Sequence, residues 1–194
     1  MSEPVTCPDH PGLTNDPSHW LNLIDKHCVP YTYAELILFG GGCLMWVVAY
    51  GILIRDSFRF KYMEMAAVAG CSNIAWEFIW SWAFQTDMGK FLVWTYRAWF
   101  FLDLLIFWQL LRLGDQQVTQ PAFKKHFKPA AILITLAFAS LYYFYAKQGM
   151  DTLIGANSAY LCQLVISSTC LLLLLGSPTL RGFSMPIAWL RSVG

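Results

Sequence analysis

The sequence is poor in charged residues. Asp, Glu, Lys and Arg together make up 13% of its 194 residues, whereas a soluble globular domain carries about 25%. Hydrophobic residues make up 57% and aromatic residues 16% of the chain. Because so few charges cannot cover the surface of a water-soluble protein, we expect much of this surface to face lipid.

The sequence also lacks the motifs of several common function classes. Its basic residues form no stripe or patch, which excludes a nucleic-acid-binding protein. No glycine-rich phosphate loop, nucleophile elbow or Asp-rich motif for diphosphate ionisation is visible. The His and Cys residues near the N-terminus match no standard zinc spacing, so we predict no metal and no other cofactor. Cys7 and Cys28 either stay free or form a disulfide in an oxidising compartment.

Five hydrophobic stretches follow a polar N-terminal segment, residues 1–33, in which residues 20–24 predict a short interfacial helix. A membrane-spanning helix needs about 20 apolar residues. The predicted spans are residues 34–54, 62–84, 91–113, 130–146 and 155–175. Residues 184–190 resemble the start of a sixth span. We therefore predict an all-α, polytopic membrane helix bundle over residues 34–194, and we expect its C-terminal part to be incomplete.

The basic residues indicate how this bundle is oriented, because Lys and Arg concentrate in cytoplasmic loops. The segments after the first, third and fifth predicted spans hold eight of these residues, and the alternate segments hold three. The eight are Arg55, Arg59, Lys61, Arg112, Lys124, Lys125, Lys128 and Arg181, and the three are Lys26, Lys90 and Lys147. The sequence thus predicts a multi-pass integral membrane protein with a lumenal or periplasmic N-terminus and cytoplasmic basic loops. With no apolar signal-peptide region before it, the first span is expected to direct insertion.

Polar residues inside the predicted spans gather at one depth. Glu77 lies in the second span, where a charged side chain near mid-membrane costs roughly 3 kcal/mol. Asn73 precedes it by one helical turn and shares its face. The third span carries Asp103. Further residues at similar depth are Trp76, Trp80, Trp99, Asn157, Tyr160 and Gln163. Together these residues predict a pocket between the second, third and fifth spans.

A carboxylic acid in such a pocket has a restricted chemistry. In an apolar environment it keeps its proton, which it can then donate to an epoxide or an alkene. Indole and phenol faces stabilise the cation that forms, and the exclusion of water lets this cation cyclise. The residues thus favour protonation of a hydrophobic substrate over phosphate or acyl chemistry.

Each of these residues also has a structural interpretation. Glu77 can be a neutral acid bonded to Asn73, and Asp103 can pair with Arg97 or with another helix. Tryptophans are typical interfacial anchors, and the polar stripe of the fifth span is typical of helix packing. At the level of function, the alternatives to an enzyme are a proton-coupled transporter, a lipid- or isoprenoid-binding membrane protein, and a structural membrane subunit.

Four stretches of the sequence resemble one family of enzymes. They are residues 73–78 (Asn-Ile-Ala-Trp-Glu-Phe), 97–103, 157–167 and 181–189. These stretches are similar to the small integral-membrane terpene cyclases of fungal meroterpenoid and indole-diterpene pathways, of the paxilline or pyripyropene type, and to their bacterial relatives. The resemblance covers roughly residues 33–194.

The resemblance implies a metal-independent lyase or isomerase that cyclises an epoxidised prenyl chain attached to an aromatic or indole head. The candidate acid of the family maps to Glu77. The family typically has seven spans and a second important acid in the last one, which has no counterpart here. Asp103, which the resemblance does not assign, is our candidate for a second catalytic carboxylate. The residues expected to bind substrate are Asn73, Trp76, Trp80, Trp99, Asn157, Tyr160 and Gln163. The expected partners are a hydrophobic prenylated small molecule and membrane lipid.

Overall fold

The computed structural model describes residues 33–84, 86, 89–152, 154–177 and 183–193. These residues form helices and no strand, which confirms the all-α prediction. The elements are α1 (Tyr33–Phe60), α2 (Ala67–Phe78), the π-helical turn η3 (Ile79–Ala83), α3 (Gly89–Leu113), the 3-10 turn η4 (Gly114–Gln117), α4 (Pro121–Lys125), α5 (Phe127–Lys147), α6 (Ala156–Gly176) and α7 (Met185–Val193). The interfacial helix predicted at residues 20–24 and the thiols of Cys7 and Cys28 lie outside the described residues.

The second predicted span begins later than its hydropathy indicated. We predicted a helix from Tyr62, whereas residues 61–66 form a non-helical connection and α2 begins at Ala67. The side chain of Gln117 holds this connection. Its Nε2 donates to the carbonyls of Met63 and Met65 at 2.9 and 2.8 Å, and its Oε1 accepts the N–H of Ala67 at 2.9 Å. These bonds satisfy backbone groups that a helix would otherwise pair internally.

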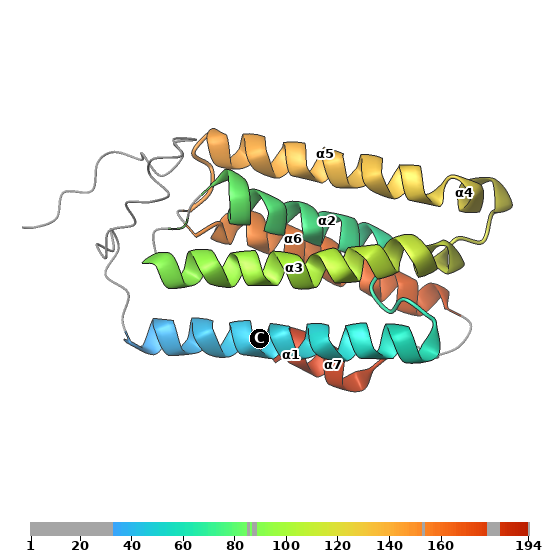
Figure 1. The fold of residues 1–194 in the computed structure, drawn as a ribbon, viewed down its shortest axis with the longest axis horizontal. Helices are drawn as coiled ribbons and strands as arrows, with labels where there is room; N and C mark the ends of the chain where they lie inside the picture. The colour runs from blue at the N-terminus through green and yellow to red at the C-terminus, as the bar shows by residue number, and fades with distance from the viewer. Residues whose placement is uncertain (1–32, 85, 87–88, 153, 178–182, 194) are drawn as a thin grey trace, which may run out of the picture.

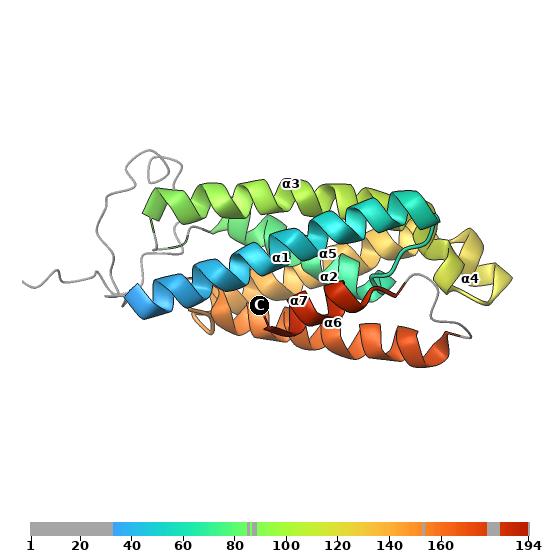
Figure 2. The same ribbon diagram turned by 90° about the horizontal axis from the view of Figure 1, so that it is seen from below.

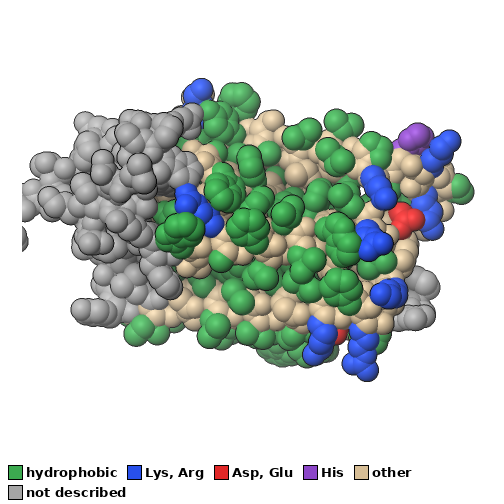
Figure 3. Space-filling model, viewed as in Figure 1, with side chains coloured by type: hydrophobic (Ala, Val, Ile, Leu, Met, Phe, Trp, Pro, Cys, Tyr) green, Lys and Arg blue, Asp and Glu red, His purple; other side chains and the backbone are tan. Residues whose placement is uncertain are grey.

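Three helices in the described part of the chain are long and apolar enough to cross a membrane, namely Ile37–Phe60, Phe127–Lys147 and Ala156–Gly176. The helix α2 has 12 residues, and α3 contains two arginines and a buried aspartate. The predicted number of five complete spans therefore stays a prediction. Figure 3 shows hydrophobic side chains over the middle of the molecule and many Lys and Arg side chains towards its α4 end.

The helix α2 is the centre of the bundle. It packs against α3, α5 and α6, whereas α7 packs against α1 (Figures 1 and 2). All residues from Ala69 to Glu77 are buried. Small residues on α2 permit this close approach, and a Cβ added at Gly70 would lie 2.9 Å from Cδ2 of Leu110 on α3. The polar side chains of α2 are thus buried because their helix is surrounded on several sides.

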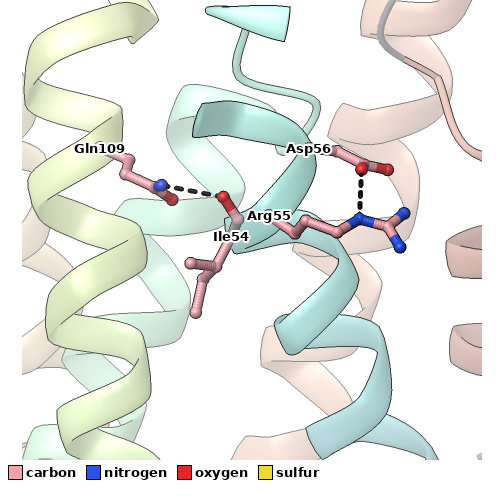
Figure 4. A network of polar contacts seen from close by, with 4 residues as sticks. All are labelled: Ile54, Arg55, Asp56 and Gln109. Atoms are coloured by element: carbon pink, nitrogen blue, oxygen red, sulfur yellow. Dashed lines mark hydrogen bonds and ion pairs between the residues drawn. The ribbon is translucent and has the colours of Figure 1, made fainter. Parts of the chain in front are cut away.

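Side-chain hydrogen bonds link neighbouring helices. Gln109 of α3 donates from Nε2 to the carbonyl of Ile54 on α1 at 3.1 Å, which fastens these two helices near one end of the bundle (Figure 4). The adjacent ion pair of Arg55 and Asp56, at 2.8 Å, lies at the surface. An exposed pair of this kind contributes little to stability, whereas the bond of Gln109 joins two helices.

Candidate active site

A cavity of about 500 Å³ lies among α1, α2, α3, α6 and α7. Its wall is mostly apolar and aromatic, with a few polar side chains, as is usual for a site that binds a small molecule. The polar lining residues include Tyr50, Asn73, Glu77, Gln163 and Arg191, and the aromatic ones include Trp46, Trp76, Tyr96, Trp99 and Tyr160. Among the residues that the structure describes, no cluster of three or more His, Cys, Asp or Glu side chains could hold a metal ion.

Glu77 lies in the wall of this cavity. Its side chain is 4% exposed, and its Oε2 has no hydrogen-bond partner. One residue later α2 ends, and the chain continues as the π-helical turn η3, an irregularity that is frequent at functional sites. A buried polar atom without a partner costs about 1–3 kcal/mol. Glu64 and Asp103 also have a buried carboxyl oxygen without a partner, but of these three carboxyl groups only that of Glu77 lines the cavity, which makes it the candidate for a chemical task.

Asp103 lies behind the cavity wall. Its Oδ2 accepts a hydrogen bond from Nδ2 of Asn73 at 2.5 Å, and the same amide donates to Oη of Tyr50 at 2.6 Å. Asp103 is buried and does not line the cavity, whereas Asn73 and Tyr50 do. Two open alternatives are decided by these bonds. Asp103 pairs with another helix and not with Arg97, and Asn73 binds Asp103 instead of Glu77.

The aromatic wall is held in place from α6. Nε1 of Trp76 donates to Oγ of Ser158 at 2.8 Å, and Nε1 of Trp80 donates to the same oxygen at 3.2 Å. The ring of Tyr96 meets Trp76 edge to face at 5.6 Å and stacks on Trp99 at 6.4 Å. These contacts keep the ring faces fixed, as stabilisation of a cation requires.

Trp80 itself lies outside the wall, against Gly155. This glycine has a φ of +74°, and a Cβ there would overlap the indole of Trp80. Only glycine adopts such a backbone conformation readily and leaves room for the ring. Trp80 therefore packs η3 against the N-terminal end of α6 and does not line the cavity.

Six of the nine predicted site residues line the cavity. They are Asn73, Trp76, Glu77, Trp99, Tyr160 and Gln163. Tyr160 is 75% exposed, so its part of the wall is open to the surroundings. Asn157 lies at the surface in the first turn of α6, where its Nδ2 donates to the carbonyl of Met150 at 2.9 Å. Asn157 thus helps to close the connection before α6 and does not face the cavity.

Sequence reasoning missed the contribution of α1 and α7. The residues Phe39, Cys43, Trp46 and Tyr50 line the cavity from one face of α1, at the spacing of three or four that marks a helix face. That spacing was visible, but an apolar helix without internal charge is also typical of a lipid-facing span. Arg191 of α7 enters the wall because α7 folds back along α1.

The fold and the cavity define a membrane-type helical bundle with a buried carboxyl group in an aromatic pocket. The family model of Pyr4-like transmembrane terpene cyclases matches residues 27–194. The chain therefore belongs to this family, as its sequence motifs predicted, and it is a membrane protein. Its predicted orientation in the membrane stays a prediction.

Several curated relatives are fungal proteins. Pyr4-family terpene cyclase mfmH of Annulohypoxylon moriforme is 33% identical over 102 residues, which cover 50% of this chain and 40% of that protein. Terpene cyclase dpchB of Colletotrichum higginsianum is 26% identical over 182 residues, or 90% and 74% of the two chains. Asnovolin H synthase nvfL of Aspergillus novofumigatus is 26% identical over 148 residues, or 76% and 60%. The chain thus spans between 40% and 74% of these relatives. No solved structure matches it.

Proposed function

We propose that this protein is a membrane terpene cyclase in which Glu77 starts the reaction by protonating a prenyl chain that carries an epoxide or an alkene. The observation that carries the proposal is the unpartnered carboxyl oxygen of Glu77 in the wall of an aromatic cavity. Membership of the cyclase family supports the class of reaction. The substrate is a hydrophobic prenylated molecule, which the apolar lining suits.

For an epoxide, the carboxyl group of Glu77 donates its proton to the epoxide oxygen, and the C–O bond to the more substituted carbon breaks. The π electrons of the nearest alkene attack this carbon, so a C–C bond forms and the positive charge moves along the chain. Further alkenes react in the same way. A carbon beside the last cation then loses a proton, which leaves an alkene, and this proton returns to the carboxylate of Glu77 directly or through water, so that the acid is restored. The product is an isomer of the substrate with a new hydroxyl group.

The cavity provides two conditions for this cascade. The faces of Trp76, Tyr96 and Trp99 lie where they can stabilise a cation, and an apolar wall keeps water from capturing it. Asp103 does not line the cavity, so we assign it the role of a positioning residue. It fixes Asn73, and Asn73 fixes Tyr50 through the two hydrogen bonds described above.

The test is product analysis with membranes that contain the chain and membranes that lack it. The substrates are a farnesylated hydroxybenzoate methyl ester with a terminal epoxide and the same ester without the epoxide. We expect a product that has the same mass as the epoxide substrate but contains a new ring and no epoxide. This product should form only in membranes that contain the protein.

Two other outcomes contradict the proposal. A product heavier by one water molecule indicates epoxide hydrolysis. Unchanged ester that accumulates inside sealed vesicles in response to a proton gradient indicates transport, the alternative in which Glu77 carries protons without chemical change of the solute.

A further inference from the structure

Arg191 places a guanidinium group at the cavity. It lies near the end of α7 and lines the cavity beside Ser192. Its Cζ lies 5.2 Å from the ring centre of Trp46 on α1, and its Nη1 approaches Sγ of Cys170 on α6 at 3.9 Å. The guanidinium thus lies between two helices, over the indole of Trp46.

This guanidinium has no carboxylate partner within the described residues. The salt bridge found there joins Arg55 and Asp56 at the surface. The charge of Arg191 acts on Asp103, Tyr50 and Glu64 through space, but none of these three forms a hydrogen bond or an ion pair with it. A guanidinium carries five N–H donors, and a thiol sulfur is a weak acceptor. A partly buried charge without a partner is costly, so acceptor oxygens of a ligand would find free donors here.

The lining also differs from one part of the cavity to another. Arg191 lies over Trp46, one turn before Tyr50, and Tyr50 bonds to Asn73, so these three polar lining groups follow one another along one part of the wall. Elsewhere the wall is aromatic and apolar. There Tyr96 packs on Trp76 and donates to the carbonyl of Ile154 at 3.1 Å. An amphipathic ligand matches this division, with an apolar chain on the aromatic wall and a polar head beside the guanidinium.

We propose that Arg191 binds an anionic oxygen on the aromatic head of the substrate and so selects prenylated aromatic acids over neutral prenylated molecules. This inference rests on the proposed function and names the substrate class for the same cavity. The planar fork of arginine binds a carboxylate through two parallel hydrogen bonds. The Cζ atom of Arg191 lies over the indole of Trp46, and apart from the weak contact of Nη1 with Sγ of Cys170 its N–H groups have no acceptor among the described residues.

The test measures binding without turnover. The probes are a hydroxybenzoic acid with a saturated farnesyl-type chain, which cannot cyclise, and its methyl ester. Binding to the full chain in nanodiscs is followed by quenching of tryptophan fluorescence. We expect the acid to bind the wild type about 10- to 100-fold more tightly than the ester, as for hydrogen bonds to charged groups. Arg191→Gln should lose this preference, with the Kd of the ester unchanged.

Arg112→Gln is the matched control. The guanidinium of Arg112 also stacks on an indole, that of Trp108, at 4.6 Å, but it does not line the cavity. This variant should keep the full preference for the acid. Partitioning of the probes into lipid is the same for all variants, so a change in the ratio of the two Kd values reports the site.

An acid-to-ester ratio that is equal in the wild type and in Arg191→Gln overturns the inference. Binding of the ester and thermal unfolding show whether the variant is folded. If it is not, Arg191→Met carries the test, because methionine keeps a long unbranched side chain and removes the charge and the donors, and an unchanged ratio in that variant overturns the inference. Wild-type cyclisation without a preference for the acid refutes this inference alone. Arg191-dependent binding without any cyclisation refutes the proposed function alone.

Discussion

The two faces of α2 use polar residues in opposite ways. On the packed face, Ser72 and Tyr142 of α5 share a hydrogen bond of 2.6 Å between their hydroxyl oxygens, and Sγ of Cys71 donates to the carbonyl of Ala131. On the cavity face, Glu77 keeps a buried oxygen without a partner. The packed face therefore stabilises the bundle, whereas the cavity face lowers its stability. An unsatisfied buried group calls for an explanation, and for Glu77 the explanation offered is its place in the cavity wall.

The largest effect is expected for Glu77→Gln on the cavity face. The amide has almost the same shape but no proton to donate, so turnover of an epoxidised prenyl arene should fall by about 10²–10⁴-fold, the usual contribution of a general acid. Because Oε2 has no partner to lose, the unfolding temperature should stay the same or rise. Product formation and thermal unfolding of the same preparation check both statements. A large drop in unfolding temperature would mean that Glu77 is structural.

The second effect is expected for Asn73→Leu. Asn73 lines the cavity, as Glu77 does, but it also forms buried hydrogen bonds, as Ser72 does on the packed face. The variant leaves Asp103 and the hydroxyl of Tyr50 without their amide partner, so we expect a loss of about 1–3 kcal/mol in unfolding free energy. Turnover should also fall, but by less than in Glu77→Gln, because the acid remains. Denaturant unfolding in micelles measures the first quantity. An unfolding free energy equal to that of the wild type would contradict a stabilising role of these hydrogen bonds.

A smaller effect is expected for Tyr142→Phe on the packed face. The variant removes the hydroxyl that bonds to Ser72 and keeps the ring, so it should cost about 1 kcal/mol of unfolding free energy. Turnover per folded molecule should equal that of the wild type, because Tyr142 does not line the cavity. Thermal unfolding combined with active-site titration provides the measurement, and a selective loss of turnover would break the division between the two faces.

The last effect is on the pH dependence of stability and concerns Glu64 in the connection before α2. Burial raises the pKa of Glu64 from 4.5 to about 7, although the N–H of Ser184, at 2.8 Å from Oε1, and Arg191 oppose this rise. The folded state then binds the proton more tightly than the unfolded state. Its contribution to stability is therefore fully present below about pH 4.5 and is lost as pH rises towards about 7. Glu64→Gln keeps an acceptor for the N–H of Ser184 but cannot titrate, so the stability of this variant should depend less on pH in this range.

Unfolding temperatures of the wild type and of Glu64→Gln test this prediction when they are measured from about pH 3.5 to about pH 8, which extends about one unit beyond each of the two pKa values. Parallel curves would show that the carboxyl group of Glu64 does not titrate in this window.

The sequence predicted what depends on local spacing. Hydropathy located the helices, and the interval of four residues placed Asn73 and Glu77 on one face of α2. Hydropathy could not locate the start of α2. The side chain that holds the segment before this helix belongs to Gln117, which lies 50 residues away from Ala67. Sequence reasoning also grouped Trp80 with Trp76 by depth, whereas η3 begins at Ile79 and Trp80 packs against Gly155 outside the cavity.

The remaining parts of the site depend on tertiary packing. Arg191 reaches the cavity only because α7 packs on α1, which its own sequence does not indicate. Asp103 and Glu77 look equivalent as carboxylates within apolar helices. Each keeps one buried carboxyl oxygen without a partner, but Asn73 binds the other oxygen of Asp103, and of the two only Glu77 lines the cavity. Roles that depend on such pairing need the structure.

The most direct test of this account compares Glu77→Gln and Tyr142→Phe side by side, with turnover expressed per folded molecule. The account predicts that Glu77→Gln loses turnover and keeps its unfolding temperature, while Tyr142→Phe keeps its turnover and unfolds at a lower temperature. Equal turnover per folded molecule in the two variants would contradict the assignment of Glu77 as the proton donor.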